Sequence, residues 1–446
     1  MKKLLKNKFL ICYFAIFFLL SCSTIVYLYQ IRNMSGDPIR SDGMGYYIYL
    51  PAKFIYHDLA FSFEHPFFEG LNILENGAVV NKYPLGTAIL ETPFYFIADV
   101  IASLSSKYQA DGFSLPYQYA IVIAALFYCF WGLIIVYDIL RRYYSSYVVN
   151  WTMIFLCYGT SLFHYATFDA SFSHVYSFFL ISLFIWMVIK IEEENKTKVS
   201  YYFLLGVVAG LIFNVRNPNV IVVFFYIFYR VHTWTDLKKR FIDIFRLKKL
   251  IPPCLGGMMM ISIQCIYWYM ATGKPIIRSY GSEETFSWIF PHLYSVLASV
   301  SKGLIFYSPI LGLALLGVFC IKRYFSSSIS IMVVTILHLY ITSAWDCWQY
   351  GGSFGQRPFV DVYCLYAILL ACILQFFEDI QLKIINGNVV KMLNLLLPVF
   401  CLMLFWSLKM MLAYWHCILP IVDANMNDIW NVIQWNFDEM RNLIIK

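Results

Sequence analysis

The stretch that decides the fold lies near the amino terminus and reads FLICYFAIFFLLSCSTIVYLYQI, residues 9–31. Its 23 residues contain no charged side chain, and about 20 apolar residues in a helix are enough to cross the hydrocarbon core of a bilayer. Within the stretch, Ser21-Cys22 resembles the cleavage site of a lipoprotein signal peptide. Because the apolar character continues well beyond that point, the pattern favours an uncleaved first transmembrane helix.

Similar apolar runs recur along almost the whole chain of 446 residues. Hydrophobic residues make up 61% of the sequence and charged residues 13%, whereas a soluble domain is about half apolar and about a quarter charged. We therefore predict an all-α polytopic membrane domain, residues 1–414, with about 11 transmembrane helices. The tail, residues 415–446, is predicted to lie at the outer interface. The predicted spans cover residues 9–31, 117–140, 147–163, 172–190, 200–214, 217–230, 250–270, 304–320, 328–344, 359–377 and 392–414.

Clusters of lysine and arginine predict the orientation, because these residues mark the cytoplasmic ends of spans. With a cytoplasmic N-terminus and an outer C-terminus, every basic cluster falls on the cytoplasmic side. We therefore predict a multi-pass plasma-membrane protein with this orientation. The clusters are Lys2, Lys3, Lys6 and Lys8; Arg141 and Arg142; residues 190–198; residues 238–249; Lys322 and Arg323; and Lys383.

One apolar segment does not fit this count. Residues 84–105 read PLGTAILETPFYFIADVIASLS and carry Glu91, Asp99 and two prolines. If this segment spanned the membrane, Arg141 and Arg142 would lie outside. An amphipathic or re-entrant element at the outer interface fits the charges better.

Polar residues that are costly at a membrane boundary gather on the predicted outer side. They come from the first outer loop, residues 32–116, from short turns at Asp169 and Arg216, and from a late loop, residues 345–361. Ionisable groups in such places are usually paired or functional. Their convergence on one side predicts an outward-facing active site.

The first outer loop contains SDGMGYYIYLP, residues 41–51, in which Asp42 precedes a glycine-flanked aromatic cluster. The glycines allow a tight turn, and the tyrosines can anchor a short helix at the interface. Because ionisable side chains at a membrane boundary are usually paired or functional, Asp42 is a candidate functional residue. An N-cap of the following helix is an equally good explanation of Asp42.

The same loop contains NKYPLG, residues 81–86, in which Lys82 stands just before Pro84. A lysine beside the positive end of a helix suits an anion such as phosphate. A lysine that only snorkels to the interface would look the same. Lys302, at the start of span 304–320, is expected to snorkel in this way.

These residues resemble the GT-C membrane glycosyltransferases, in particular bacterial lipid-A aminoarabinose transferases and protein mannosyltransferase-like enzymes. The resemblance rests on Asp42 after the first span, on Lys82-x-Pro84, on a span that ends in Arg141-Arg142, and on Asp169 before a later span. It covers roughly the first 190 residues by motif and the rest by architecture. The family's Asp-Glu pair is Asp-Gly here, and its Lys-Pro-Pro is Lys-Tyr-Pro.

The resemblance implies an enzyme that moves a sugar from a polyprenyl-phosphate donor to an acceptor hydroxyl on the outer, periplasmic face of the inner membrane. A carboxylate would take the acceptor's proton, and fixed cations would hold the phosphate, with inversion at the anomeric carbon. Asp42 is the implied base and Asp169 the second catalytic aspartate. The implied phosphate ligands are Lys82, Arg216, Arg278 and Arg357.

Further residues are candidates for contact with the sugars. Trp348 and Gln356 belong to the glycine-rich stretch WQYGGSFGQRPFVDVY, residues 348–363, which can equally be a flexible interfacial turn. His174 follows Asp169 closely, although a lone histidine there is more often a packing residue. An ion pair with a nearby aspartate is as good an explanation of Arg216 as phosphate binding. The predicted substrate-contact residues are Tyr46, Tyr83, His174, Trp348 and Gln356.

No motif demands a cofactor, and the 12 cysteines show no metal-ligand spacing. A divalent metal is a possible addition, with no ligand set assigned. The expected partners are a polyprenyl-phosphate-linked sugar, a glycan, lipid or protein acceptor, and membrane lipids, but no nucleic acid.

Two other functions compete with this one. A transporter or flippase of lipid-linked glycans would place charges near the bilayer midplane and is usually built from repeated halves. No internal repeat is visible here, and the charges lie at span ends. A polysaccharide ligase or polymerase would use a similar lipid-linked donor. No feature of the sequence shows whether the donor carries one phosphate or two.

Overall fold

The computed structural model describes residues 8–31, 37–66, 68–74, 77–280, 284–383 and 389–435. These residues are mostly helical, and six of their helices are long and apolar enough to cross a membrane. The prediction of a helical, multi-pass membrane protein is thereby confirmed in its general form. The six helical spans are Lys8–Tyr29, Leu115–Leu140, His174–Glu193, Leu247–Thr272, Arg357–Asp379 and Met392–Trp415.

The other predicted spans are shorter or interrupted helices in the described chain. Segment 217–230 forms the 3-10 helix η3 (Asn217–Val222) and α10 (Val223–Ile227), and segment 304–320 is divided at Pro309. Proline removes a backbone donor and starts helices better than it continues them. The total of about 11 spans therefore stays a prediction.

Contacts divide the chain into two compact units. The first unit comprises residues 1–139, 165–284 and 327–338, and the second comprises residues 140–164, 285–326 and 339–446. Helices α5 (Leu115–Leu140), α7 (Leu162–Thr167) and α17 (Ser328–Ala344) have residues in both. The first unit also holds α1 (Lys8–Val26), the π-helix η2 (Tyr27–Ile31), α2 (Asp42–Tyr47), α3 (Tyr49–Phe54), β1 (Leu71–Ile73), β2 (Val79–Asn81), α4 (Gly86–Ser103), α8 (His174–Glu193), α9 (Val199–Val215), η3, α10, α11 (Trp234–Ile244) and α12 (Leu247–Thr272).

Glycines let α9 and α12 pack backbone to backbone in the first unit. A β-carbon on Gly206 would lie 2.0 Å from the carbonyl oxygen of Pro253, and one on Gly210 would lie 2.7 Å from that of Gly257. Small residues four apart are a common way for membrane helices to approach closely. Helices α9 and α12 therefore form a packed pair, and other segments of the first unit are attached to the two ends of α12.

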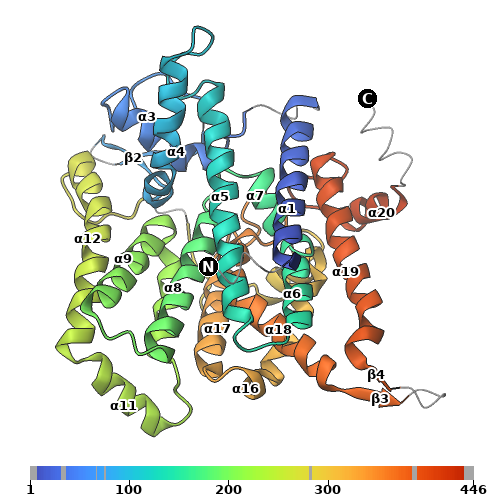
Figure 1. Ribbon diagram of the computed structural model, residues 1–446. Helices are drawn as coiled ribbons and strands as arrows, with labels where there is room; N and C mark the ends of the chain where they lie inside the picture. The colour runs from blue at the N-terminus through green and yellow to red at the C-terminus, as the bar shows by residue number, and fades with distance from the viewer. Residues whose placement is uncertain are drawn as a thin grey trace. The chain divides into compact units, whose positions relative to one another are not determined.

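The first outer loop contacts one end of α12, and helix α11 contacts the other end (Figure 1). Tyr267, near the C-terminal end of α12, accepts a hydrogen bond from the backbone N–H of Asn81 in β2. Lys249, near its N-terminal end, is paired with Asp243 of α11. At 1.5 Å per residue these contacts are about 27 Å apart along the helix axis, close to the thickness of a bilayer's hydrocarbon core.

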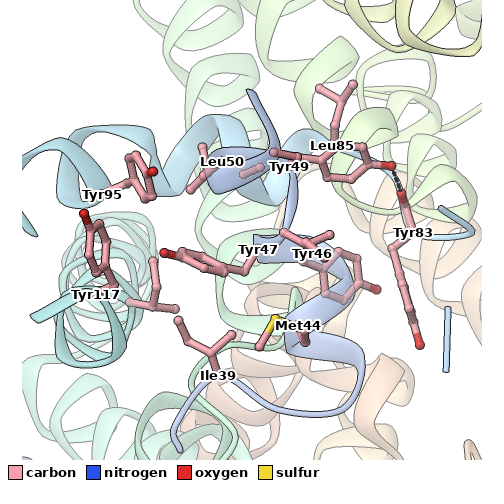
Figure 2. Close-up of a cluster of buried hydrophobic side chains, with 14 of the residues drawn as sticks. Ile39, Met44, Tyr46, Tyr47, Tyr49, Leu50, Tyr83, Leu85, Tyr95 and Tyr117 are labelled. Carbon is pink, nitrogen blue, oxygen red and sulfur yellow. Dashed lines mark hydrogen bonds between the residues drawn. The ribbon is translucent and has the colours of Figure 1, made fainter. Parts of the chain in front are cut away.

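The first outer loop packs around an aromatic core that it shares with the start of α5 and the end of α12 (Figure 2). Tyr47 is fully buried, and its hydroxyl donates to the carbonyl oxygen of Gly112. Tyr95 and Tyr117 are also fully buried, with ring centroids 5.3 Å apart. The tyrosine-rich sequence after Asp42 therefore folds inward as the core of this loop, in addition to any interfacial role.

The ambiguous segment 84–105 forms one continuous helix, α4, with Pro93 inside it. Glu91 is fully buried and accepts a hydrogen bond of 3.0 Å from the hydroxyl of Tyr176. The opposite face exposes Ile97 and Val100. An amphipathic helix was one of the two predicted forms, and α4 is not among the six helical spans found in the described residues.

The second unit is built around α18 (Tyr363–Asp379), which is buried along nearly its whole length. Gly317 packs against the backbone of Leu369, and the hydroxyl of Tyr144 donates to the carbonyl oxygen of Ile368. A two-stranded hairpin joins α18 to α19. The other elements are α6 (Ser146–Tyr158), α13 (Leu293–Ala298), α14 (Leu304–Tyr307), α15 (Pro309–Leu316), η4 (Gly317–Phe319), α16 (Ile321–Tyr324), η5 (Arg357–Val362), β3 (Gln381–Lys383), β4 (Val389–Lys391), α19 (Met392–Trp415) and α20 (Met426–Gln434).

The predicted C-terminal tail contains a helix, α20, capped by Asn425 and Asp428, and its place at the outer interface stays a prediction. Ile429 and Val432 are buried, whereas Trp430 is exposed. The later part of the predicted helix, residues 436–446, lies outside the described residues.

The orientation predicts a labelling result. An epitope tag inserted after the exposed Gln109 should react with antibody on intact spheroplasts, because the first outer loop is expected on the outer side. A tag inserted after Lys196, in the basic turn between α8 and α9, should react only after permeabilisation. Equal reactivity of the two tags without permeabilisation would contradict this topology.

Candidate functional site

The carboxylate of Asp42 is held by a tyrosine from the second half of the same loop. Asp42 is the first residue of α2 and is half-buried. Its Oδ1 accepts a hydrogen bond of 2.7 Å from the hydroxyl of Tyr83. Ser41, rather than Asp42, occupies the N-cap position, so the alternative explanation of Asp42 as an N-cap is wrong. A carboxylate in the first turn is still favoured by the helix dipole.

Tyr83 is held by hydrogen bonds to its backbone and by ring contacts (Figure 2). Its backbone N–H donates to the side chain of Asn81 at 3.0 Å, and its carbonyl oxygen accepts from the hydroxyl of Tyr49 at 2.6 Å. Its ring lies 4.8 Å from that of Tyr46. A β-carbon on Gly45 would lie 2.1 Å from the Tyr83 ring, so only glycine permits this approach.

The environment keeps the hydroxyl of Tyr83 protonated. Burial raises the pKa of Tyr83 far above its usual range, and the neighbouring charge of Asp42 raises it further. The phenol therefore remains a hydrogen-bond donor at any physiological pH. The resulting arrangement is an oriented carboxylate that is partly open to solvent.

Two predicted cations belong to the same region. The ammonium of Lys82 lies 5.2 Å from the centre of the Tyr83 ring, and no carboxylate of the described residues forms an ion pair with it. Burial raises the pKa of Tyr280, the charges of Asp42 and Glu284 add to the increase, and the guanidinium of Arg216 opposes it. The chain just before Arg216 also lies beside the Lys82 segment, since a β-carbon on Gly86 would lie 2.3 Å from the carbonyl carbon of Asn214.

Tyr280 also lies beside Tyr83, with ring centroids 6.5 Å apart. Arg278, two residues earlier, is exposed and donates to the carbonyl oxygen of Glu284 at 2.6 Å. Residues 278–280 thus include one predicted phosphate ligand, Arg278, and a tyrosine that lies beside Tyr83, the donor to Asp42. Sequence reasoning missed Tyr280, although it lies two residues from the predicted Arg278.

The segment around Asp42 packs against the turn that carries Asp169. A β-carbon on Gly43 would lie 1.9 Å from Oγ of Ser171, and that hydroxyl donates to the carbonyl oxygen of Pro38 at 3.0 Å. Arg40 forms an ion pair of 3.2 Å with Asp169, which is nearly buried. The two predicted aspartates therefore belong to segments in direct contact, although 127 positions separate them in the sequence.

Asp169 and His174 have surroundings that suit structural roles. The guanidinium of Arg40 also lies 4.3 Å from the ring of Phe168, so the pair joins the two segments firmly. His174 is only 1% exposed and starts α8, with the ring of Tyr165 5.1 Å away. These contacts favour packing over substrate contact for His174. The role of Asp169 stays a prediction.

The remaining predicted residues belong to the second unit. The side-chain amide of Gln356 donates to the carbonyl oxygen of Trp348 at 3.1 Å. Arg357 begins η5, is 9% exposed, and lies 5.9 Å from the ring of Tyr350. The stretch thus forms an internally bonded turn, and its role in binding a sugar stays a prediction.

The expectation for Lys302 is wrong. This lysine is fully buried, and its ammonium donates to the carbonyl oxygens of Ser353 and Ile421. A buried ammonium needs such partners because it has lost its water. Lys302 therefore ties the glycine-rich turn to the chain after α19 and does not snorkel to the interface.

A metal has no evident site in the part of the chain that the structure describes. No three His, Cys, Asp or Glu side chains come together there in a way that could hold an ion. The possible divalent metal remains a prediction.

Comparison with known proteins adds no assignment. No family model and no curated protein matches this chain. The resemblance to GT-C enzymes consequently rests on the sequence motifs, and the function must be argued from the site.

Proposed function

We propose that this chain is a membrane glycosyltransferase of the GT-C type, which moves a sugar from a polyprenyl-phosphate donor to an acceptor hydroxyl. The observation that carries the proposal is the half-buried carboxylate of Asp42, held by the Tyr83 hydroxyl at 2.7 Å. Lys82 and Arg216 from two other segments lie near the same tyrosine cluster. Base and cations are the two kinds of group that this transfer needs.

In the proposed reaction, Asp42 accepts the proton of the acceptor hydroxyl as its oxygen attacks the anomeric carbon. The bond from the anomeric carbon to the phosphate oxygen breaks, and its electron pair leaves with the polyprenyl phosphate. Attack from the opposite face inverts the anomeric centre. The hydrogen bond from Tyr83 orients the carboxylate without protonating it, because the raised pKa of Tyr83 keeps the proton on the phenol.

Lys82, Arg216 and Arg278 are the proposed phosphate ligands. The phosphate of the leaving carrier is a stable anion, so the site has to balance negative charge and needs no strong acid. Arg278 lies two residues before Tyr280, the backbone of Asn214 and Val215 just before Arg216 packs against Gly86, and the ammonium of Lys82 lies 5.2 Å from the centre of the Tyr83 ring. Arg357 belongs to the second unit, and the proposal does not depend on it.

The direct test supplies purified protein with a panel of polyprenyl-phosphate sugars and measures released polyprenyl phosphate. The expected result is release that depends on one class of sugar and on an added acceptor. If a fluorescent glycolipid instead crosses the bilayer without any new glycosidic bond, the transporter alternative is favoured. Release only from a diphosphate-linked oligosaccharide would favour the ligase or polymerase alternative.

Replacement of Tyr83 by phenylalanine should lower the rate without abolishing it. The variant keeps the ring that packs on Gly45 and Tyr46 and removes only the hydroxyl that orients Asp42. We expect kcat to fall about tenfold, the effect of one misoriented catalytic group, with KM for the donor little changed. Tyr49→Phe is the matched control, because its hydroxyl contacts the backbone of Tyr83 and not Asp42. An equal loss of kcat in the control would contradict the specific role of the Tyr83 hydroxyl.

A further inference from the structure

Helix α11 has its two faces reversed relative to a helix on a water-soluble surface. Trp234, Phe241, Ile242 and Phe245, the last one residue past the helix end, are all exposed, with Trp234 at 70% and Ile242 at 68%. They recur at the spacing of one helical face. The opposite, protein-facing side carries Arg240, which is buried.

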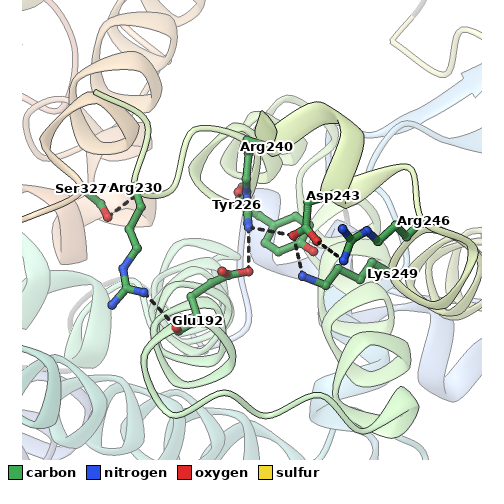
Figure 3. A network of polar contacts seen from close by, with 8 residues as sticks. All are labelled: Glu192, Tyr226, Arg230, Arg240, Asp243, Arg246, Lys249 and Ser327. Atoms are coloured by element: carbon green, nitrogen blue, oxygen red, sulfur yellow. Dashed lines mark hydrogen bonds and ion pairs between the residues drawn. The ribbon is translucent and has the colours of Figure 1, made fainter. Parts of the chain in front are cut away.

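The polar side is bound to the protein by a charged network (Figure 3). Arg240 forms an ion pair of 2.9 Å with Glu192 and donates to the carbonyl oxygen of Tyr226 at 2.8 Å. Asp243 is paired with Lys249 and, at 3.4 Å, with Arg246. This network fixes the rotation of α11 and therefore holds its apolar face outward.

Charge is also divided between the two faces. The acidic residues of α11, Asp236 and Asp243, are partly buried in the capping box and the network. The exposed side carries Lys238, Lys239 and Arg246 among the apolar residues, with the ammonium of Lys238 5.9 Å from the ring of Trp234. An apolar face flanked by cations and without exposed acids complements an anionic bilayer surface.

The position of α11 along the chain points to the same partner. Only Phe245 and Arg246 separate it from α12, one of the six helical spans. The exposed face of α11 therefore lies where α12 enters the bilayer, at the end opposite the Asp42 loop (Figure 1). Aromatic and basic side chains are favoured at that depth.

We propose that the exposed face of α11 is a docking surface for anionic phospholipids, held at the membrane interface on the lysine-rich side. The apolar residues enter the boundary between headgroups and acyl chains, and Lys238, Lys239 and Arg246 bind the headgroup phosphates. This surface is independent of the glycosyltransferase proposal, and its test needs no turnover.

The test places p-benzoylphenylalanine at Phe245 in the full-length protein, with a second probe at Ile242 in case the first disturbs folding. Each protein is reconstituted in vesicles of phosphatidylethanolamine and phosphatidylglycerol, irradiated, and analysed for lipid adducts by mass spectrometry. We expect phosphatidylglycerol to be enriched in the adducts about fivefold over its share of the bilayer, the effect of one cation near an anionic surface. The same probe at Ile263, an exposed position within α12, is the control and should report the bilayer composition.

Replacement of Lys238 and Lys239 together by glutamine, which leaves the pair of Arg246 with Asp243 intact, should abolish the enrichment while adducts still form. Adducts in proportion to the bilayer composition at Phe245 and Ile242 of the unaltered surface would overturn the proposal. Absence of lipid adducts at both positions would also overturn it. So would capture of a protein, rather than lipid, when the probes are irradiated in native membranes.

Discussion

Asp42→Asn should reduce sugar transfer by about a thousandfold, in the range that general-base catalysis contributes. The amide has nearly the same size and can still accept a hydrogen bond from Tyr83, but it cannot take a proton from the acceptor hydroxyl. Because Asp42 is half-buried at the start of α2 rather than at its N-cap, folding and membrane insertion should be preserved. The measurement is released polyprenyl phosphate per unit of correctly inserted protein.

The control for this variant is Asp37→Asn. Asp37 belongs to the same loop and is exposed, so the change removes a carboxylate of the same charge from the same neighbourhood. Asp37→Asn should keep nearly full activity. Full activity in Asp42→Asn would remove Asp42 as the base, whereas equal losses in both variants would point to a general electrostatic effect.

Asp169→Asn should destabilise the protein by about 2 to 3 kcal/mol, because breaking a largely buried ion pair leaves its partner uncompensated. The partner is Arg40, whose side chain is 21% exposed against 7% for Asp169, so partial solvation moderates the loss. The pair joins the Asp42 segment to the turn before α8. Its loss should therefore also lower activity by loosening the loop that holds the base.

A double-mutant cycle separates this positioning role from a catalytic role. If Asp169 acts through Arg40, then Arg40→Gln should lower activity as much as Asp169→Asn, and the double variant should lose little more. If Asp169 takes part in the chemistry, its replacement should cost far more activity than that of Arg40. The control Lys190→Gln breaks an exposed i,i+4 pair with Glu194 and should change stability by less than about 0.5 kcal/mol. Thermal unfolding in detergent and turnover per folded protein are the two measurements.

The helical membrane architecture could be predicted because it depends on local composition. Apolar runs such as residues 9–31 and 392–414 predict long helices from their composition alone, without contacts to distant residues. Segments 217–230 and 304–320 were predicted as single spans but are interrupted near Pro218 and Pro309, and such breaks depend on neighbouring residues as well as on proline. The number of spans inferred from apolar length is therefore less reliable than the prediction of a helical membrane protein.

The candidate site could be predicted only in part, because its contacts join distant segments. Asp42 and Lys82 were visible as unusual charges beside apolar runs. The ion pair between Arg40 and Asp169 joins residues 129 positions apart, and a single sequence contains no signal for it. Tyr83 was predicted as a substrate contact, but its hydrogen bond to Asp42 depends on folding and has no signal in the sequence. The prediction for Lys302 was wrong for the same reason. The carbonyl groups that bind its ammonium belong to Ser353 and Ile421, which only folding brings close to it.

Photoaffinity labelling with a polyprenyl phosphate that carries a diazirine on its first isoprene unit tests the central claim most directly. The site described here predicts label in peptides that contain residues 42–47, 82–86 or 278–280, with the label reduced by excess unlabelled polyprenyl phosphate and by Lys82→Gln with Arg216→Gln. Label confined to other parts of the chain, or label that excess carrier does not displace, would contradict a phosphate site beside Asp42.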